Sequence, residues 1–219
     1  MYLMEGKAMK KFALIAASAL TLGAVATAAA QAPNVSLAVS KPAGGPEGTT
    51  TTVLYGELVR VSGELSNGQP NQAVQQTITP YRATPRTVTL RTDASGDFEY
   101  THRPLIRTSY SASWNNQAST QEPYAHVRPK VGLRVISARL GQFRVTMAAQ
   151  PQYVSRVVWF QRRITATRWA TVKKIQLRAS NLSATFTARI PRGTNRVRIL
   201  VPQTPGYLRA TSRFVKVTR

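Results

Sequence analysis

Residues 142–149 read QFRVTMAA, and this stretch decides the fold. Phe143, Val145 and Met147 point one way along an extended chain, while Arg144 points the other. Side chains with a period of two put the apolar residues on one face of a strand and the polar residues on the opposite face. We therefore predict a β-strand with a buried face and a solvated, arginine-bearing face, as in an antiparallel sheet.

The same alternation recurs through the last ninety residues of the chain. In residues 195–201, three β-branched residues alternate with two arginines and a leucine. Gly141, Gly193 and Pro205-Gly206 break the segments apart, as turn residues do. The strands expected in this half are residues 131–138, 142–149, 156–164, 169–177, 183–189, 195–201 and 208–217.

The preceding hundred residues are patterned in the same way. Their expected strands are residues 35–40, 53–65, 72–81, 86–92, 97–102, 108–114 and 124–128. Seven short strands at this spacing indicate an antiparallel sandwich, and no window has the 3.6-residue apolar period of a helix. The halves match collinearly, for example in Val-x-Leu at 35–37 and 131–133, which suggests a duplication. We predict two tandem domains, residues 33–129 and 130–219, with almost no linker between them.

The N-terminus is typical of an export signal. Lys7, Lys10 and Lys11 precede an apolar run over residues 12–29, and A-x-A cleavage patterns follow at 28–30 and 30–32. The alternative is an uncleaved anchor, since the run is close to the roughly 20 residues that span a bilayer. Its alanine-rich, weakly apolar composition favours cleavage, so residues 1–32 are predicted to be a signal peptide of a secreted protein.

The charge of the chain is distributed unevenly. Lys and Arg number 30 against 8 Asp and Glu, a formal net charge of +22. Residues 130–219 hold 19 of the basic residues and none of the acidic ones, whereas residues 33–129 hold 8 basic and 7 acidic residues. A domain with one sign of charge repels itself, so we expect anions from outside to accompany it. The alternative is that the basic content is merely compositional.

Few residues could support catalysis or metal binding. The chain has no cysteine, which excludes disulfides and cysteine-ligated zinc. His102 and His126 have no nucleophile elbow or orienting acid in the sequence around them. Asp93, Asp97 and Glu99 could bind calcium, but a turn in which Asp93 hydrogen-bonds its own backbone explains them more simply. We expect no enzyme activity, no cofactor and no metal site.

A family resemblance rests on the best-patterned part of the chain. Its residues are Tyr55-Gly56, Val59-Arg60-Val61-Ser62-Gly63, Thr92-Asp93-x-x-Gly96-x-Phe98 and Thr108-x-Tyr110-x-Ala112. They resemble the bacterial immunoglobulin-like repeats of secreted and surface proteins, especially those of actinobacteria. The resemblance implies two immunoglobulin-like antiparallel β-sandwich domains that act as spacers, stalks or binding modules, and it implies no single activity. The second half has Arg178-Ala179-Ser180-Asn181 where the family has an Asp-x-x-Gly turn.

The candidate binding residues are basic and lie in the second domain. Guanidinium groups suit phosphate, sulfate and carboxylate, and the nearby Trp159, Phe160 and Trp169 could stack on sugars or bases. Alternatively, Trp159 or Phe160 is a core residue, and adjacent basic residues point to opposite faces. The candidates are Arg162, Arg163, Arg168, Lys173, Lys174, Arg178, Arg192, Arg196 and Arg198.

These patterns predict a secreted or cell-surface protein without catalytic activity. Its second domain would attach to an anionic polymer, most naturally one of the cell envelope, and its first domain would be a spacer or a surface for other proteins. Nucleic acid is a less favoured ligand because no nucleic-acid-binding motif is present. The alternatives are a stalk without a ligand, or a secreted enzyme or enzyme inhibitor that uses the first domain.

Overall fold

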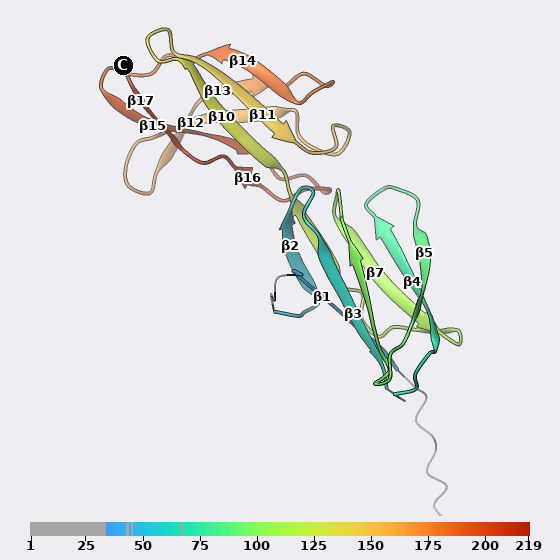
Figure 1. The fold of residues 1–219 in the computed structure, drawn as a ribbon. Coiled ribbons are helices and arrows are strands. Elements are labelled where there is room, and N and C mark those ends of the chain that lie inside the picture. Colours follow the sequence, from blue (N-terminus) through green and yellow to red (C-terminus); the bar gives the residue numbers. More distant parts are fainter. Residues whose placement is uncertain (1–33, 43, 45, 67) are drawn as a thin grey trace, which may run out of the picture. The chain divides into compact units, whose positions relative to one another are not determined.

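The computed structural model describes residues 34–42, 44, 46–66 and 68–219, and all regular structure in these ranges is β-strand (Figure 1). The predicted all-β class is therefore confirmed. The predicted signal peptide lies outside the described residues. In the part of the chain that the structure describes, no helix has the length and hydropathy needed to cross a membrane.

The first group of strands forms two sheets. Their orders are β1-β3-β6 and β2-β9-β7-β4-β5, and β8 pairs with β7. All pairs are antiparallel except β2 with β9, which is parallel. The strands are β1 (Val35–Ser40), β2 (Thr50–Leu54), β3 (Val59–Leu65), β4 (Ala73–Pro80), β5 (Arg86–Arg91), β6 (Asp97–His102), β7 (Thr108–Trp114), β8 (Gln117–Ala118) and β9 (Tyr124–Arg128).

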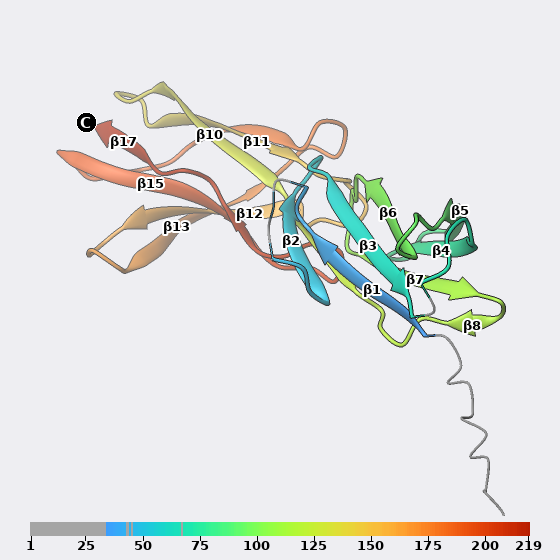
Figure 2. The same cartoon turned by 60° about the horizontal axis from the view of Figure 1, so that its bottom comes forward.

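The second group also forms two sheets. Their orders are β10-β11-β14 and β13-β12-β15-β16, and β17 pairs with β15. In Figure 2 the strands β10 and β11 lie apart from β12, β13 and β15. The strands are β10 (Lys130–Ser137), β11 (Gln142–Ala148), β12 (Val157–Arg163), β13 (Trp169–Gln176), β14 (Ser183–Thr187), β15 (Thr194–Val201), β16 (Ala210–Thr211) and β17 (Val215–Thr218).

The two groups share one topology. In each, the smaller sheet joins the first strand, the next long strand and the strand that follows the hairpin of the larger sheet. In the first group that hairpin is β4–β5, and β4 also pairs with β7. In the second group it is β12–β13, and β12 also pairs with β15. This arrangement is that of an immunoglobulin-like sandwich. The chain thus consists of tandem immunoglobulin-like sandwiches, and the predicted boundaries at 33, 129 and 130 remain predictions.

Most predicted strands agree with the observed ones to within two residues, but residues 53–65 are not one strand. β2 and β3 belong to different sheets, and the chain passes between the sheets at residues 55–58. Gly56 has φ +81, which favours glycine, and the Glu57 carboxylate accepts a hydrogen bond from the Leu54 amide at 2.8 Å. The expected strand 208–217 is likewise divided into β16 and β17. Between them, the Ser212 hydroxyl accepts the Ile199 amide at 2.9 Å.

The core of the second sandwich explains why residues 142–149 decide the fold. Phe143, Val145 and Met147 are all buried, as their alternation predicted. Phe143 of β11 meets Phe160 of β12 at 4.8 Å between ring centroids and Phe186 of β14 at 5.5 Å. These rings come from both sheets, so they hold the sheets face to face. Burying each ring contributes about 1.5–3 kcal/mol.

The first sandwich uses a glycine to seat its corresponding aromatic ring. Gly63 of β3 is paired with Phe98 of β6, whose side chain is buried. A Cβ at position 63 would overlap the Phe98 ring and the Ser36 carbonyl oxygen. Glycine is therefore required for close approach, as expected where an aromatic side chain covers a strand glycine.

The second sandwich has a turn that begins at Arg178, where the first has its Asp-x-x-Gly turn at Asp93. Backbone hydrogen bonds close both turns. In the first, the Asp93 amide bonds the Asp97 carbonyl at 2.8 Å and Gly96 has φ +87. In the second, the Arg178 amide bonds the Ser183 carbonyl at 3.0 Å, and Leu182 takes the positive φ of 45. A buried leucine thus replaces glycine in the left-handed region.

Residues 33–219 form one compact unit, and several hydrogen bonds join its two halves. The Leu208 amide donates to the Val127 carbonyl at 3.0 Å, and the Arg107 amide donates to the Gly206 carbonyl at 3.0 Å. The Tyr207 hydroxyl donates to the Leu105 carbonyl. The connection between β15 and β16 therefore bonds directly to residues that precede Pro129.

The core of the first sandwich contains a buried amide. Gln76 of β4 is fully buried between Val74 and Ile78, and among the described residues neither amide atom has a hydrogen-bond partner. An unpaired buried amide costs roughly 1–3 kcal/mol. We expect Gln76→Leu, a change of similar volume, to raise the free energy of unfolding by about 1–2 kcal/mol in chemical denaturation. A lower stability of the variant would contradict the assignment of an unpaired amide.

A second polar pair gives the fold a dependence on pH. The His102 Nδ1 lies 3.0 Å from the Tyr110 hydroxyl, and burial, followed by the charge of Arg86, lowers the pKa of His102 to about 4. The unfolded chain binds a proton near pH 6.5, whereas the folded chain does so only near pH 4. Stability is therefore full above pH 6.5 and falls as the pH is lowered towards 4.

Replacing His102 isolates its contribution to this pH dependence. Between pH 6.5 and 4, we expect His102→Gln to lose less stability than the wild type, measured by thermal melts at each pH. His126→Gln serves for comparison, because burial and then Arg107 also lower the pKa of His126, but less than the pKa of His102 is lowered. We expect His126→Gln to change the pH dependence of stability less than His102→Gln does. Parallel curves for the wild type and His102→Gln would show that His102 titrates as an exposed histidine.

Candidate functional site

The outer face of the larger sheet in the second sandwich gathers basic and aromatic side chains. Phe160 and Ile199 are paired across β12 and β15 and are buried on the inner face. Their neighbours Trp159 and Arg198 therefore point outward, because side chains alternate along a strand. The outward residues form rows across the strands β13, β12, β15 and β17.

Three cations occupy one of these rows. Arg162 pairs with Val197, so the next residues along the two strands, Arg163 and Arg196, face each other. Arg196 in turn pairs with Lys216 of β17. Like charges placed directly across neighbouring strands destabilise a sheet. The row is therefore costly unless anions approach it.

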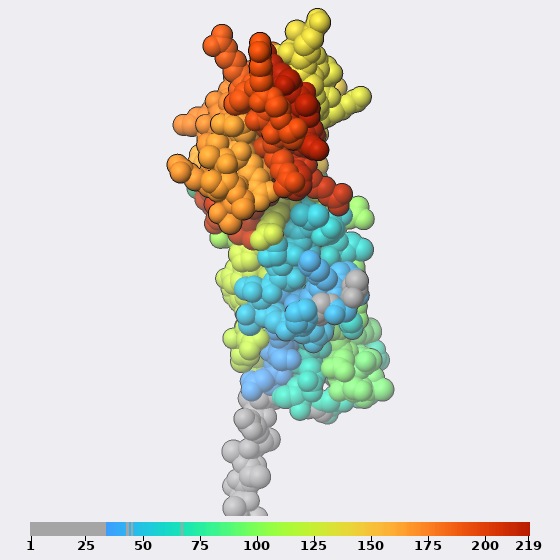
Figure 3. All heavy atoms as spheres, turned by 90° about the vertical axis from the view of Figure 1, so that its left-hand side faces the viewer, coloured from blue at the N-terminus to red at the C-terminus, as the bar shows by residue number. Residues whose placement is uncertain are grey.

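We call this surface the basic face. Trp159 pairs with Lys174, and Trp169 pairs with Arg163. Each tryptophan on this face thus has a cation directly across the strand pair. Side chains of β12–β13 and of β15 and β17 lie next to each other on the side of the molecule seen in Figure 3, in orange to red. The basic face consists of Arg163, Lys174, Arg196, Arg198 and Lys216 with Trp159 and Trp169.

Contacts with neighbouring side chains hold these arginines in place. The Arg198 guanidinium lies over the Trp169 ring, 4.1 Å from its centroid, and its Nε donates to Gln161 Oε1 at 3.0 Å. Arg196 lies 5.1 Å from the centroid of the Phe214 ring. Burial, and secondarily the charge of Arg209, lowers the pKa of Arg198. A fixed and partly dehydrated guanidinium loses less entropy and less hydration when it binds an anion.

Only part of the predicted set reaches this face. It brings together four of the nine candidates, which are Arg163, Lys174, Arg196 and Arg198. Arg162 and Lys173 point to the other side of the sheet, and Lys173 Nζ donates to the Thr187 carbonyl of β14 at 2.9 Å. The remaining three lie in turns outside the strands: Arg168, Arg178 and Arg192.

Sequence reasoning missed Lys216 as a member of the site. Its strand was expected to run from residue 208 to 217 without a break, so its register with β15 was not assigned. The alternation of Val215, Lys216 and Val217 was the available signal, since it marks Lys216 as outward-facing. Pairing of Lys216 with Arg196 required the sheet topology.

Basic residues also lie elsewhere on the second sandwich. Arg134 of β10 and Arg144 of β11 pair directly on the outer face of the smaller sheet, and both are exposed. The positive charge therefore surrounds this sandwich. The basic face differs from the smaller sheet in its row of three cations and in its tryptophans. Among the described residues the one side-chain ion pair joins Arg60 to Glu99, both in the first sandwich.

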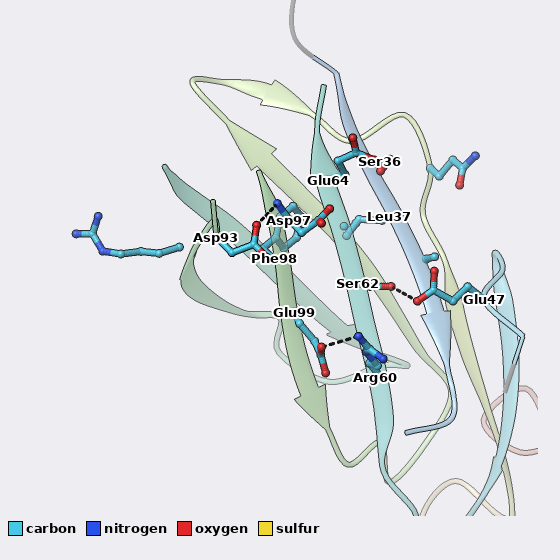
Figure 4. A pocket seen from close by; sticks show the side chains of 14 residues that line it. Ser36, Leu37, Glu47, Arg60, Ser62, Glu64, Asp93, Asp97, Phe98 and Glu99 are labelled. Atoms are coloured by element: carbon cyan, nitrogen blue, oxygen red, sulfur yellow. Dashed lines mark hydrogen bonds and ion pairs between the residues drawn. The ribbon is translucent and has the colours of Figure 1, made fainter. Parts of the chain in front are cut away.

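Five of the seven acidic residues of the first sandwich line a groove on its smaller sheet (Figure 4). Its volume is about 630 Å³. Glu99 is paired with Arg60 at 2.8 Å, and Glu47 accepts the Ser62 hydroxyl at 3.0 Å. Asp93 Oδ1 accepts the amides of residues 95 and 97 at 2.8 and 3.0 Å, which confirms the predicted Asx-type turn. No group of three metal-ligating side chains occurs among the described residues.

Among the described residues, neither histidine has the hydrogen-bond partners of a catalytic base. His102 contacts the Tyr110 hydroxyl, and burial raises the pKa of that tyrosine. His126 is half-buried beside Arg107 and lines a cavity of about 80 Å³. Within the described ranges, no hydrogen bond joins either histidine to a carboxylate.

Comparison with known proteins finds neither a matching family model nor a matching curated protein. Among solved structures, one similar chain is a tetra-tandem repeat in the extending region of a large adhesion protein, at 14% identity and a TM-score of 0.40. The match covers 85% of this chain and 49% of that one, so this chain spans about half its length. Others are Salmonella alpha-2-macroglobulin (13% identity, 84% and 14% coverage, TM-score 0.32) and the FN1–FN3 domains of chicken CNTN1 (16% identity, 80% and 70% coverage, TM-score 0.26).

Proposed function

We propose that this chain is a secreted, non-catalytic binding protein whose second sandwich attaches to an anionic polymer of the cell envelope through the basic face. The observation that carries the proposal is the row of Arg163, Arg196 and Lys216 on neighbouring strands, in a domain without a single Asp or Glu. Bound anionic groups would remove the repulsion within the row. The polymer's own counter-ions would be released, which favours binding further at low salt.

The first sandwich has a different role in this proposal. Its net charge is +1, and four of its seven carboxylates, those of Glu47, Glu57, Asp93 and Glu99, are engaged with Ser62, Arg60 or backbone amides. A sandwich of nearly balanced charge attracts a polyanion little, so in this proposal it acts as a spacer or as a surface for another protein. A stalk without any ligand is the competing function, and it requires that the basic surface binds nothing at physiological salt.

A pair of matched triple variants tests the attachment. We expect the protein to be retained on heparin-agarose at physiological salt and to be released at markedly lower salt in Arg163→Gln/Arg196→Gln/Lys216→Gln. The slope of log affinity against log salt should fall in magnitude by about 2–3, because binding through three fewer ionic contacts releases fewer counter-ions from the polymer. A pull-down on bacterial envelope fractions should show the same loss.

The control removes equal charge from the smaller sheet, as Lys130→Gln/Arg134→Gln/Arg144→Gln. We expect it to shift elution much less than the first variant. Equal shifts would show that the whole charge of the sandwich, and not the basic face, determines retention. A wild-type protein that passes through heparin-agarose at physiological salt would leave the ligand-free stalk as the function.

A further inference from the structure

The two tryptophans of the basic face do not belong to the core. Phe160 packs between the sheets, while its neighbour Trp159 and the cross-strand Trp169 are absent from the hydrophobic core and from the residues packed against it. The third tryptophan of the chain, Trp114, does pack against the core of the first sandwich. Two large aromatic rings thus lie on a solvent-facing surface, and core packing does not account for them.

Each of these rings has a basic residue directly across the strand pair. Trp159 lies across from Lys174, and Trp169 lies across from Arg163 while Arg198 covers it at 4.1 Å. The two pairs are four residues apart along β12, which corresponds to about 13 Å of extended strand. The surface therefore repeats one unit, an aromatic ring beside a cation, at two points along a sheet.

From this repeat we infer that the polymer held by the basic face is an acidic polysaccharide. This inference rests on the proposed function and specifies its ligand. Each sugar ring has a C–H face that packs on an indole and a carboxylate or sulfate that pairs with the neighbouring cation. An extended chain of such rings presents both features repeatedly, as the surface does. A polymer made only of phosphate has no apolar face for the tryptophans.

Single-stranded nucleic acid also combines rings with anions, but the surface fits it less well. Bases stack over an open aromatic face. Trp159 and Trp169 are both half-buried, and Arg198 already lies over the Trp169 ring. A half-buried ring offers less area than the full plane of a base covers, whereas a few C–H groups of a sugar cover less.

The test compares three polyanions on the full-length protein: heparin oligosaccharide, inorganic polyphosphate and oligo-dT. We expect Trp159→Ala/Trp169→Ala to weaken heparin binding about tenfold or more and to change polyphosphate binding less than twofold. The variant keeps every charge, so an ionic effect cannot produce this difference. Tyr124→Ala, which removes an exposed aromatic ring of the first sandwich, should leave both affinities unchanged.

A second measurement does not depend on a variant that folds. Two of the three tryptophans lie on the basic face, so bound heparin oligosaccharide should protect wild-type fluorescence from quenching by acrylamide, whereas polyphosphate at equal saturation should not. The inference is overturned if the double variant, shown to be folded by circular dichroism, binds heparin oligosaccharide like the wild type. Equal losses on heparin and polyphosphate would also overturn it, since the tryptophans would then only position Arg198.

The remaining outcomes separate this inference from the proposed function. Heparin and polyphosphate binding that both depend on the basic row but not on the tryptophans would keep the proposed attachment and remove the polysaccharide. Tighter binding of oligo-dT than of heparin oligosaccharide, with a larger loss in the double variant, would assign the face to nucleic acid. Failure of the wild type to bind any of the three polyanions would remove both proposals.

Discussion

The packing of two sheets through aromatic rings is the constraint on which the rest of the second sandwich depends. Phe143, Phe160 and Phe186 come from three strands and meet within 4.8 to 5.5 Å between centroids. Because these three strands bury one face in this contact, their alternate residues face water. With no acidic residue in the domain, every charged side chain on a water-facing position is basic. The packing that stabilises the domain therefore leaves its basic side chains on the surface, where their positive charges repel one another.

Contacts within the sandwich relieve this repulsion only in part. Arg196 and Arg198 lie over aromatic rings, and Arg163 Nε donates to the Thr165 carbonyl. A cation over an aromatic ring gains only about 0.5–1 kcal/mol at an exposed site. Such contacts orient the guanidinium groups but leave their charge in place. Guanidinium groups that are held in place and remain charged suit an anionic ligand, and the ligand that we propose lies on the basic face.

Much of the fold could be predicted because it depends on local alternation. The buried set Phe143, Val145 and Met147 followed from a period of two, and most strand ends followed from glycine and proline. The division of residues 53–65 could not, because it depends on the Glu57 carboxylate capping Leu54 while the chain changes sheets. A hydrogen bond from a nearby backbone amide to a side chain does not alter the hydrophobic pattern from which the strands were predicted.

The candidate site was less predictable than the fold for a related reason. Sequence patterns assign a side chain to a face of its own strand, and they do not assign the register between strands. Arg162 and Arg163 are adjacent, yet one faces the core side and the other faces Trp169 across the sheet. The row with Arg196 and Lys216 exists only because β12 and β17 both pair with β15. Charge in the sequence thus indicates that a surface is basic, while sheet topology decides which cations a single ligand can contact together.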